Sequence, residues 1–148
     1  MADYCLVVPF PGLVEVVGVA NDLPPHVTVL HPAPGDVAEI AKVLEPFDRF
    51  DVTFTRLDRF PGVLWLAPEP AEPFVTLTEA MVSRFPSYPP YGGTYSQIIP
   101  HLTDAVSLLD ETAALVEPLL PVASRVESVV LYASVDGAHW RERATFDL

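Results

Sequence analysis

A tetrapeptide of the form Pro-His-aliphatic-Thr occurs twice in this chain of 148 residues. The copies are residues 25–28 (Pro-His-Val-Thr) and residues 100–103 (Pro-His-Leu-Thr), and they begin 75 positions apart, about half the chain. They contain two of its four histidines. A motif repeated at this spacing predicts two related halves that contribute the same side chains to one site.

The alternation of side chains along a β-strand gives the repeat its meaning. In each copy the histidine and the threonine are two positions apart, so they point to the same face of a strand, while the aliphatic residue between them points to the other face. If the two strands border one cleft, the imidazoles of His26 and His101 and the hydroxyls of Thr28 and Thr103 converge on it.

Two histidines in one cleft suit hydrolysis or transfer at a phosphodiester. A neutral imidazole takes a proton from the attacking hydroxyl or water, and a protonated imidazole gives a proton to the departing oxygen. Because unperturbed imidazole has a pKa of roughly 6.5, both forms coexist at cellular pH. Threonine hydroxyls can donate hydrogen bonds to the non-bridging oxygens. The scheme requires no metal and no cofactor.

The charge balance limits the partners of the chain. It carries 8 Lys+Arg against 20 Asp+Glu, a net charge of −12. Proteins that track a long phosphate backbone usually carry a basic stripe, so long RNA or DNA is not the expected ligand. A small phosphate-bearing molecule needs only local complementarity in a pocket and remains compatible with this charge.

Length and composition predict one domain over residues 1–148, because half of the residues are hydrophobic and a chain of this size can bury a core. The apolar segment 4–8 is too short for a membrane span and lacks the basic flank of a signal peptide. Cys5 is the single cysteine, which agrees with a reducing compartment. A cytoplasmic location is therefore expected.

Hydrophobic patterns predict interspersed strands and helices, typical of an α+β domain. Strands are expected at residues 4–9, 25–30, 51–57, 62–67, 94–103, 126–135 and 140–146. Helices are expected to begin at Asp36, at Pro73 and between Ser107 and Asp110. The apolar stripes of these helices are expected to lie in the core; the third stripe consists of Leu108, Thr112, Leu115 and Leu119.

The paired motifs resemble those of the 2H phosphoesterase superfamily, the 2′-5′ RNA ligase and cyclic phosphodiesterase group. That family is defined by two His-x-Thr/Ser-x motifs, and residues 26–29 (His-Val-Thr-Val) and 101–104 (His-Leu-Thr-Asp) match them in order and at comparable spacing. The resemblance covers nearly the whole chain. Residues 60–66 look like the family's strand between the motifs, and residues 140–148 look like its last strand.

The resemblance implies a bilobal, pseudo-symmetric fold in which two antiparallel sheets line a central cleft and the helices lie outside. It implies metal-independent chemistry by a monomer on cyclic phosphates or 2′-5′-linked small nucleotides. By matched position, His26 and His101 would be the acid/base pair, and Thr28 and Thr103 would be phosphate ligands.

Two features depart from the family. The segment before His26 looks short. Asp104 stands where the family usually has an apolar residue, and strand alternation directs it away from the cleft.

Further residues are candidates for substrate binding. Tyr95 and Gln97 share the strand face of His101 if the strand extends back that far, and Tyr95 could then stack on a base. Tyr91 is expected near the mouth of the cleft. Ordinary sheet packing explains these residues equally well. Four arginines could form a local positive patch, although solvated strand ends also explain them: Arg56, Arg59, Arg141 and Arg143.

Other functions remain open at this stage. The same cleft could sense a nucleotide without catalysis, or the fold could join RNA ends as a 2′-5′ ligase. A metal site at His26 and His31 is not expected, because His31 lies five residues on, on the opposite strand face by strand alternation, and next to Pro32 in a predicted loop. A site formed by His26, His101 and Asp104 fails the same test of strand alternation.

Overall fold

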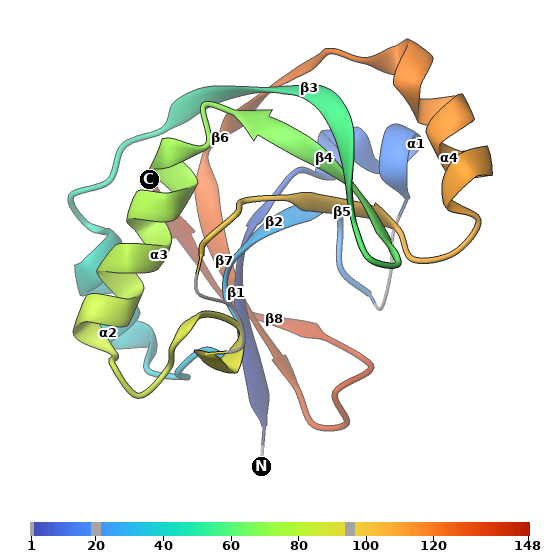
Figure 1. The fold of residues 1–148 in the computed structure, drawn as a ribbon. Helices are drawn as coiled ribbons and strands as arrows, with labels where there is room; N and C mark the ends of the chain where they lie inside the picture. The colour runs from blue at the N-terminus through green and yellow to red at the C-terminus, as the bar shows by residue number, and fades with distance from the viewer. Residues whose placement is uncertain (1, 19–21, 94–96) are drawn as a thin grey trace.

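The structure is a computed structural model that describes residues 2–18, 22–93 and 97–148 (Figure 1). In this part of the chain eight strands form one curled antiparallel sheet. The strands are β1 Asp3–Pro9, β2 His26–Leu30, β3 Phe50–Phe60, β4 Val63–Glu69, β5 Leu102–Ala105, β6 Val122–Val126, β7 Ser128–Ser134 and β8 Arg141–Asp147. The helices are α1 Val14–Val17, α2 Val37–Leu44, α3 Glu72–Arg84 and α4 Leu109–Val116, with 3₁₀ turns η1 Pro11–Leu13, η2 Pro90–Gly93 and η3 Glu117–Leu119.

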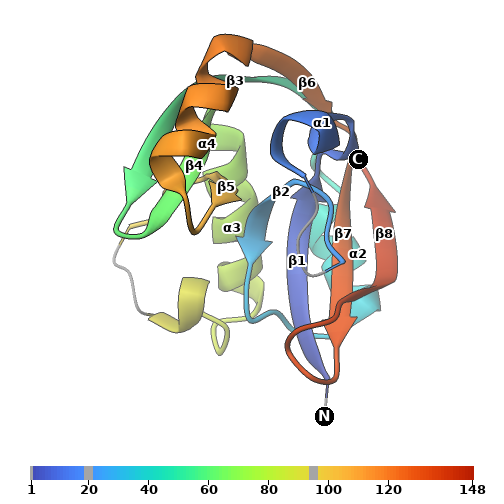
Figure 2. The same ribbon diagram turned by 90° about the vertical axis from the view of Figure 1, so that its right-hand side faces the viewer.

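The sheet has two four-stranded halves. Its strand order is β6-β3-β4-β5-β2-β1-β7-β8, so each half carries one motif strand, β5 or β2, at its inner edge. The motif strands meet where Val27 pairs with Leu102, and Figure 2 shows the halves on either side of this seam. The predicted α+β class with two related antiparallel halves is therefore confirmed, and the seam joins them into one continuous sheet.

The seam is also the middle of the hydrophobic core. Val27 and Leu102 are fully buried and belong to the same cluster as Leu66 of the neighbouring strand β4. Helix α3 contacts β2 and adds Phe74, Leu77 and Met81 to this cluster. Thr78 also lies on this helix, and its hydroxyl donates a hydrogen bond of 2.7 Å to the Val29 carbonyl. The aliphatic residues of both motifs thus fix the two strands from the side opposite the histidines.

The local signals for turns and caps agree with the structure. Asp36 caps α2 by accepting a hydrogen bond of 3.2 Å from the Glu39 amide. Proline occupies the first turn of α3. A turn at Pro61 and Gly62 joins β3 to β4, and Gly62 has the positive φ of +75° that favours glycine there.

Three predicted elements are corrected by the structure. The strand predicted from residue 94 begins only at Leu102. The strand predicted over 126–135 is two strands, because Val126 ends β6 in one half and Ser128 begins β7 in the other. The apolar stripe of α4 faces solvent, since Leu115 is 75% exposed and the buried residue of the helix is Val116.

The exposure of this stripe has a geometric cause. Helix α4 contacts β4, and the face that it turns to the sheet carries Val116. Leu108 and Leu119 lie outside that contact and are 70% and 51% exposed. Among the described residues, none of the helices is both long and apolar enough to cross a membrane.

Candidate active site

The register of β2 and β5 brings the four motif side chains together. Val27 and Leu102 are direct partners in an antiparallel pair. The same register carried one residue in each direction sets His26 opposite Thr103 and Thr28 opposite His101. Side chains in such positions share a face, with Cβ atoms about 4.5–5.5 Å apart. Residues that are 75 positions apart in sequence thus form one compact group.

Both imidazoles are oriented by the same backbone hydrogen bond. His26 Nδ1 lies 2.8 Å from the Pro24 carbonyl oxygen, and His101 Nδ1 lies 2.8 Å from the Ile99 carbonyl oxygen. A carbonyl can only accept, so Nδ1 carries the hydrogen in each ring. In the neutral ring Nε2 is then the unprotonated nitrogen, which is the position at which a proton can be taken up or released.

Burial shifts the acidity of both histidines in the same direction. Desolvation lowers the pKa of His26, the Pro24 hydrogen bond opposes part of this shift, and the nearby His101 lowers the pKa by a smaller amount. Desolvation also lowers the pKa of His101, against the hydrogen bond to Ile99. Both rings therefore favour the neutral form at pH 7.

An aromatic group surrounds His101. Its ring contacts Phe60 edge-on at 5.0 Å and Trp65 at 5.8 Å between centroids, and these two rings stack on each other at 4.8 Å. Trp65 pairs with Thr103 across β4 and β5, so it shares the face of the motif side chains. Sequence reasoning missed this support, whose only signal is that Phe60 and Trp65 flank the hairpin turn.

A cleft of about 570 Å³ lies along the motif strands. His26, Thr28 and Thr103 line it from the motifs. Cys5 lines it from β1, and Trp140 lines it from the segment before β8. A pocket of this volume is in the range that holds a small ligand.

His31 also contributes to the cleft. As predicted it lies in a loop, directly after β2. The prediction that it lies on the face opposite to His26 is wrong, because strand alternation ends with β2 at Leu30, and His31 lines the same cleft with its ring edge-on to Trp140 at 5.7 Å. The cleft therefore has an aromatic wall at this end in addition to the motif residues.

Asp104 lies in the cleft, and the prediction that it points away is wrong. Leu64 pairs with Ala105 and Trp65 pairs with Thr103, so Asp104 is an extra residue in β5, a β-bulge. A bulge interrupts the alternation of faces on which the prediction depended. Asp104 lines the cleft next to Thr103, and burial raises the pKa of its carboxyl to about 6.

The candidate substrate-binding residues have different outcomes. Gln97 is exposed, lies in a bend before β5 and is not among the residues that line the cleft. It therefore cannot share a strand face with His101, because the strand does not reach it. Tyr95 lies outside the described residues, and so does the side chain of Tyr91.

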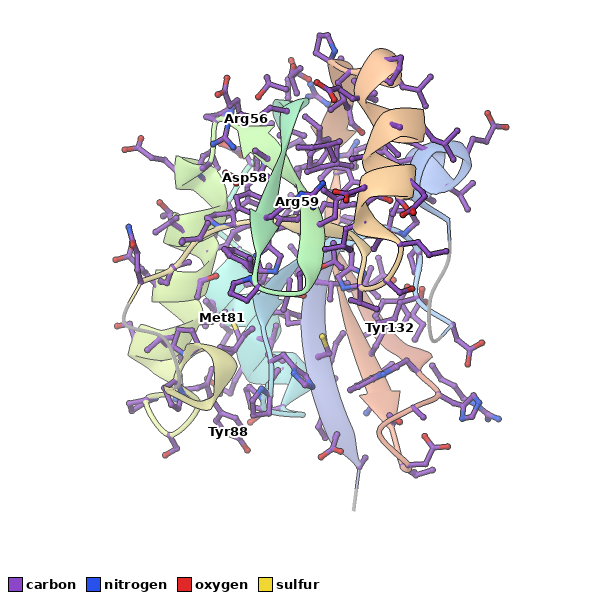
Figure 3. All side chains as sticks on the ribbon, turned by 45° about the vertical axis from the view of Figure 1, so that its right-hand side comes forward. Arg56, Asp58, Arg59, Met81, Tyr88 and Tyr132 are labelled. Carbon is purple, nitrogen blue, oxygen red and sulfur yellow. The ribbon has the colours of Figure 1, made fainter. Side chains whose placement is uncertain are left out.

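The arginines do not gather in the cleft. Arg56 pairs with Asp58 at 2.6 Å, and Figure 3 labels both residues. Arg59 pairs with Asp110 of α4 at 2.8 Å. None of the residues that line the cleft, within the described ranges, is a lysine or an arginine. Nor does that part of the chain contain a group of three or more His, Cys, Asp or Glu side chains placed to hold a metal ion.

Comparison with known proteins adds a family and a fold. The family model described as the 2′-5′ RNA ligase superfamily matches residues 17–138. No curated protein matches the chain.

Solved structures share the fold over nearly the whole chain. The structure of E. coli LigT complexed with 3′-AMP aligns with a TM-score of 0.62 at 14% identity, covering 99% of this chain and 97% of that one. A structure described as a phosphoesterase aligns with a TM-score of 0.64 at 15% identity, covering 100% and 99%. E. coli LigT complexed with ATP aligns with a TM-score of 0.63 at 16% identity, covering 100% and 99%.

Proposed function

The chain belongs to the 2′-5′ RNA ligase superfamily, and on this premise we propose that it is a phosphoesterase that opens a cyclic phosphate or cleaves a 2′-5′ linkage in a small nucleotide. The observation that supports the proposal best is the pair of imidazoles, each with Nδ1 on a backbone carbonyl at 2.8 Å. This arrangement holds two equivalent Nε2 atoms, one on each motif strand, for proton transfer.

The two histidines divide the proton transfers between them. One neutral ring accepts a proton at Nε2 from an attacking water, whose oxygen forms the new bond to phosphorus. The other ring, protonated, donates its Nε2 proton to the ribose oxygen as the bond from that oxygen to phosphorus breaks. A cyclic phosphodiester is then converted into a phosphomonoester and a free hydroxyl group.

Thr28 and Thr103 hold the phosphate between the rings. Each lies opposite the histidine of the other motif strand, so the hydroxyls point into the same space as the imidazoles. Hydroxyl donors placed at the non-bridging oxygens stabilise the charge that builds on them as the water attacks. His26, Thr28 and Thr103 line the cleft together with the aromatic surfaces of His31 and Trp140, and His101 lies beside them on the neighbouring motif segment.

Turnover of a panel of small phosphodiesters tests the proposal. The panel contains the four 2′,3′-cyclic nucleotides, cyclic ADP-ribose phosphate and 2′-5′ dinucleotides, and products are followed by ³¹P NMR. We expect a phosphomonoester from at least one class. Binding of these compounds without turnover would indicate a nucleotide-sensing module, and joining of RNA ends without hydrolysis would indicate a ligase.

The rate should depend on pH as a bell. One imidazole must be neutral and the other protonated, so kcat/KM falls on both sides with apparent pKa values that belong to the coupled pair. Because burial lowers the pKa of His26 and of His101 below the ordinary value of 6.5, the maximum should lie on the acid side of pH 6.5. A rate that rises steadily to pH 10 would instead indicate a hydroxide nucleophile.

Chelation should leave the activity unchanged. The proposed proton transfers use only His26 and His101. The threonine hydroxyls stabilise the charge on the phosphate oxygens, which is the role that a metal ion would otherwise have. We expect at least 80%, roughly, of the rate to survive prolonged EDTA treatment, since no step passes through a metal. Loss of the rate with EDTA and its recovery with zinc or manganese would contradict the two-histidine scheme.

A further inference from the structure

The charges that line the cleft are unusual for a site that holds phosphate. Among the described lining residues, Asp104 is the one carboxylate and there is no lysine or arginine. Phosphate sites in proteins commonly place a guanidinium or an ammonium on the phosphate oxygens. Burial lowers the pKa of His26 and of His101, so these rings supply little positive charge above neutrality.

The carboxylate of Asp104 is not neutralised by its surroundings. Within the described part of the chain it has no ion pair, and its Oδ2 atom is buried without a hydrogen-bond partner. Burial raises the pKa of this carboxyl to about 6, so the group is ionised at pH 8. The bulge that turns it into the cleft also holds it next to Thr103.

We propose that Asp104 makes the cleft selective for singly charged phosphodiesters over doubly charged phosphomonoesters. The inference rests on the proposed function, because it treats the space between the motif residues as the phosphate position. A diester carries one negative charge, whereas a monoester carries up to two above its second pKa of about 6. The unpaired carboxylate repels a doubly charged monoester about twice as strongly as a singly charged diester. The cleft therefore binds the substrate of a diester hydrolysis more tightly than its product, and the product is released.

Binding of two simple ions tests this without turnover. Inorganic phosphate and dimethyl phosphate are titrated at pH 8 into the unmodified protein and into Asp104→Asn, and the imidazole signals of His26 and His101 are followed by NMR. Removing one unit charge beside the phosphate should tighten phosphate binding by about five- to tenfold and dimethyl phosphate binding by only about two- to threefold, because the repulsion scales with the charge of the ligand. The amide keeps the shape of the side chain.

Asp147→Asn is the matched control, because Asp147 is an exposed carboxylate on β8 and does not line the cleft. It should leave both affinities unchanged. Equal affinities for phosphate in the Asp104 variant and the unmodified protein, including no measurable binding in either, would overturn the inference. So would an equal gain for both ions, since a general effect on the cleft would not select by charge.

The result can be separated from the fate of the proposed function. If a cyclic phosphate is hydrolysed but Asp104→Asn shows no preference for phosphate, the inference fails and the phosphoesterase proposal stands. If the variant gains phosphate affinity while no phosphodiester is hydrolysed, charge selection stands and the catalytic proposal fails.

Discussion

The substitutions His26→Ala and His101→Ala should each lower kcat/KM by at least about a hundredfold, because each removes one proton-transfer partner. The register places the two rings on one face of the seam, and each has its Nδ1 on a backbone carbonyl at 2.8 Å. Because each ring is held in a fixed orientation, a water molecule cannot take over its proton transfer when the ring is removed. The rate is measured on the best substrate of the panel, with circular dichroism to verify folding.

His139→Ala serves as the control for the loss of an imidazole. His139 is exposed in the loop between β7 and β8, where its Nδ1 lies 2.8 Å from Asp136 Oδ2, outside the cleft lining. Its removal should change kcat/KM by less than about twofold, as for most surface substitutions away from a site. A rate close to that of the unmodified protein in either motif variant would disprove the two-histidine mechanism.

Valine at Thr28 or Thr103 should lower kcat by about ten- to a hundredfold for each position, and the double variant should lose more than either. Removing a single donor to a developing oxyanion costs at most about a thousandfold. Thr103 is exposed and Thr28 is half-buried, so we expect water to replace part of the effect of each hydroxyl. The pH profile should keep its bell shape, because a hydroxyl that binds phosphate does not titrate near pH 7.

Thr76→Val is the matched control for these threonine variants. Thr76 lies on α3, is exposed, and its hydroxyl donates to the Glu72 carbonyl at 3.0 Å. It should leave kcat unchanged. If the bell-shaped pH profile of Thr28→Val is lost or moves by more than about one pH unit, the hydroxyl either orients a histidine or titrates together with the histidines. Either result would contradict its assigned role.

The sequence was sufficient to predict the features that depend on local pattern. The alternation of His, aliphatic and Thr predicted which residues share a face, and the structure places Val27 and Leu102 in the core opposite the histidines. Asp36 and Glu39 predicted the start of α2, and Pro61 and Gly62 predicted the hairpin. These signals are read within a few residues, so no knowledge of distant contacts is needed.

Features that depend on distant contacts could not be predicted. The bulge at Asp104 exists because β5 pairs with β4, a strand that lies some forty positions earlier. No pattern within residues 101–105 predicts this bulge. The same holds for α4, whose apolar periodicity does not say which face the sheet will cover. The aromatic support of His101 also depends on strand pairing, because Trp65 lies on β4 beside β5 and Phe60 lies at the end of β3, which pairs with β4.

The most direct test of the central claim uses a substrate whose leaving group needs no proton. A nucleoside 4-nitrophenyl phosphodiester releases nitrophenolate without a general acid, whereas a ribose oxygen needs one. One of the variants His26→Ala and His101→Ala should therefore recover most of its lost rate on the nitrophenyl ester, and the other should stay at least about a hundredfold below the unmodified protein. The variant that recovers identifies the acid, and the other identifies the base. Equal losses in both variants on both substrates would contradict a division of acid and base roles between the two motifs.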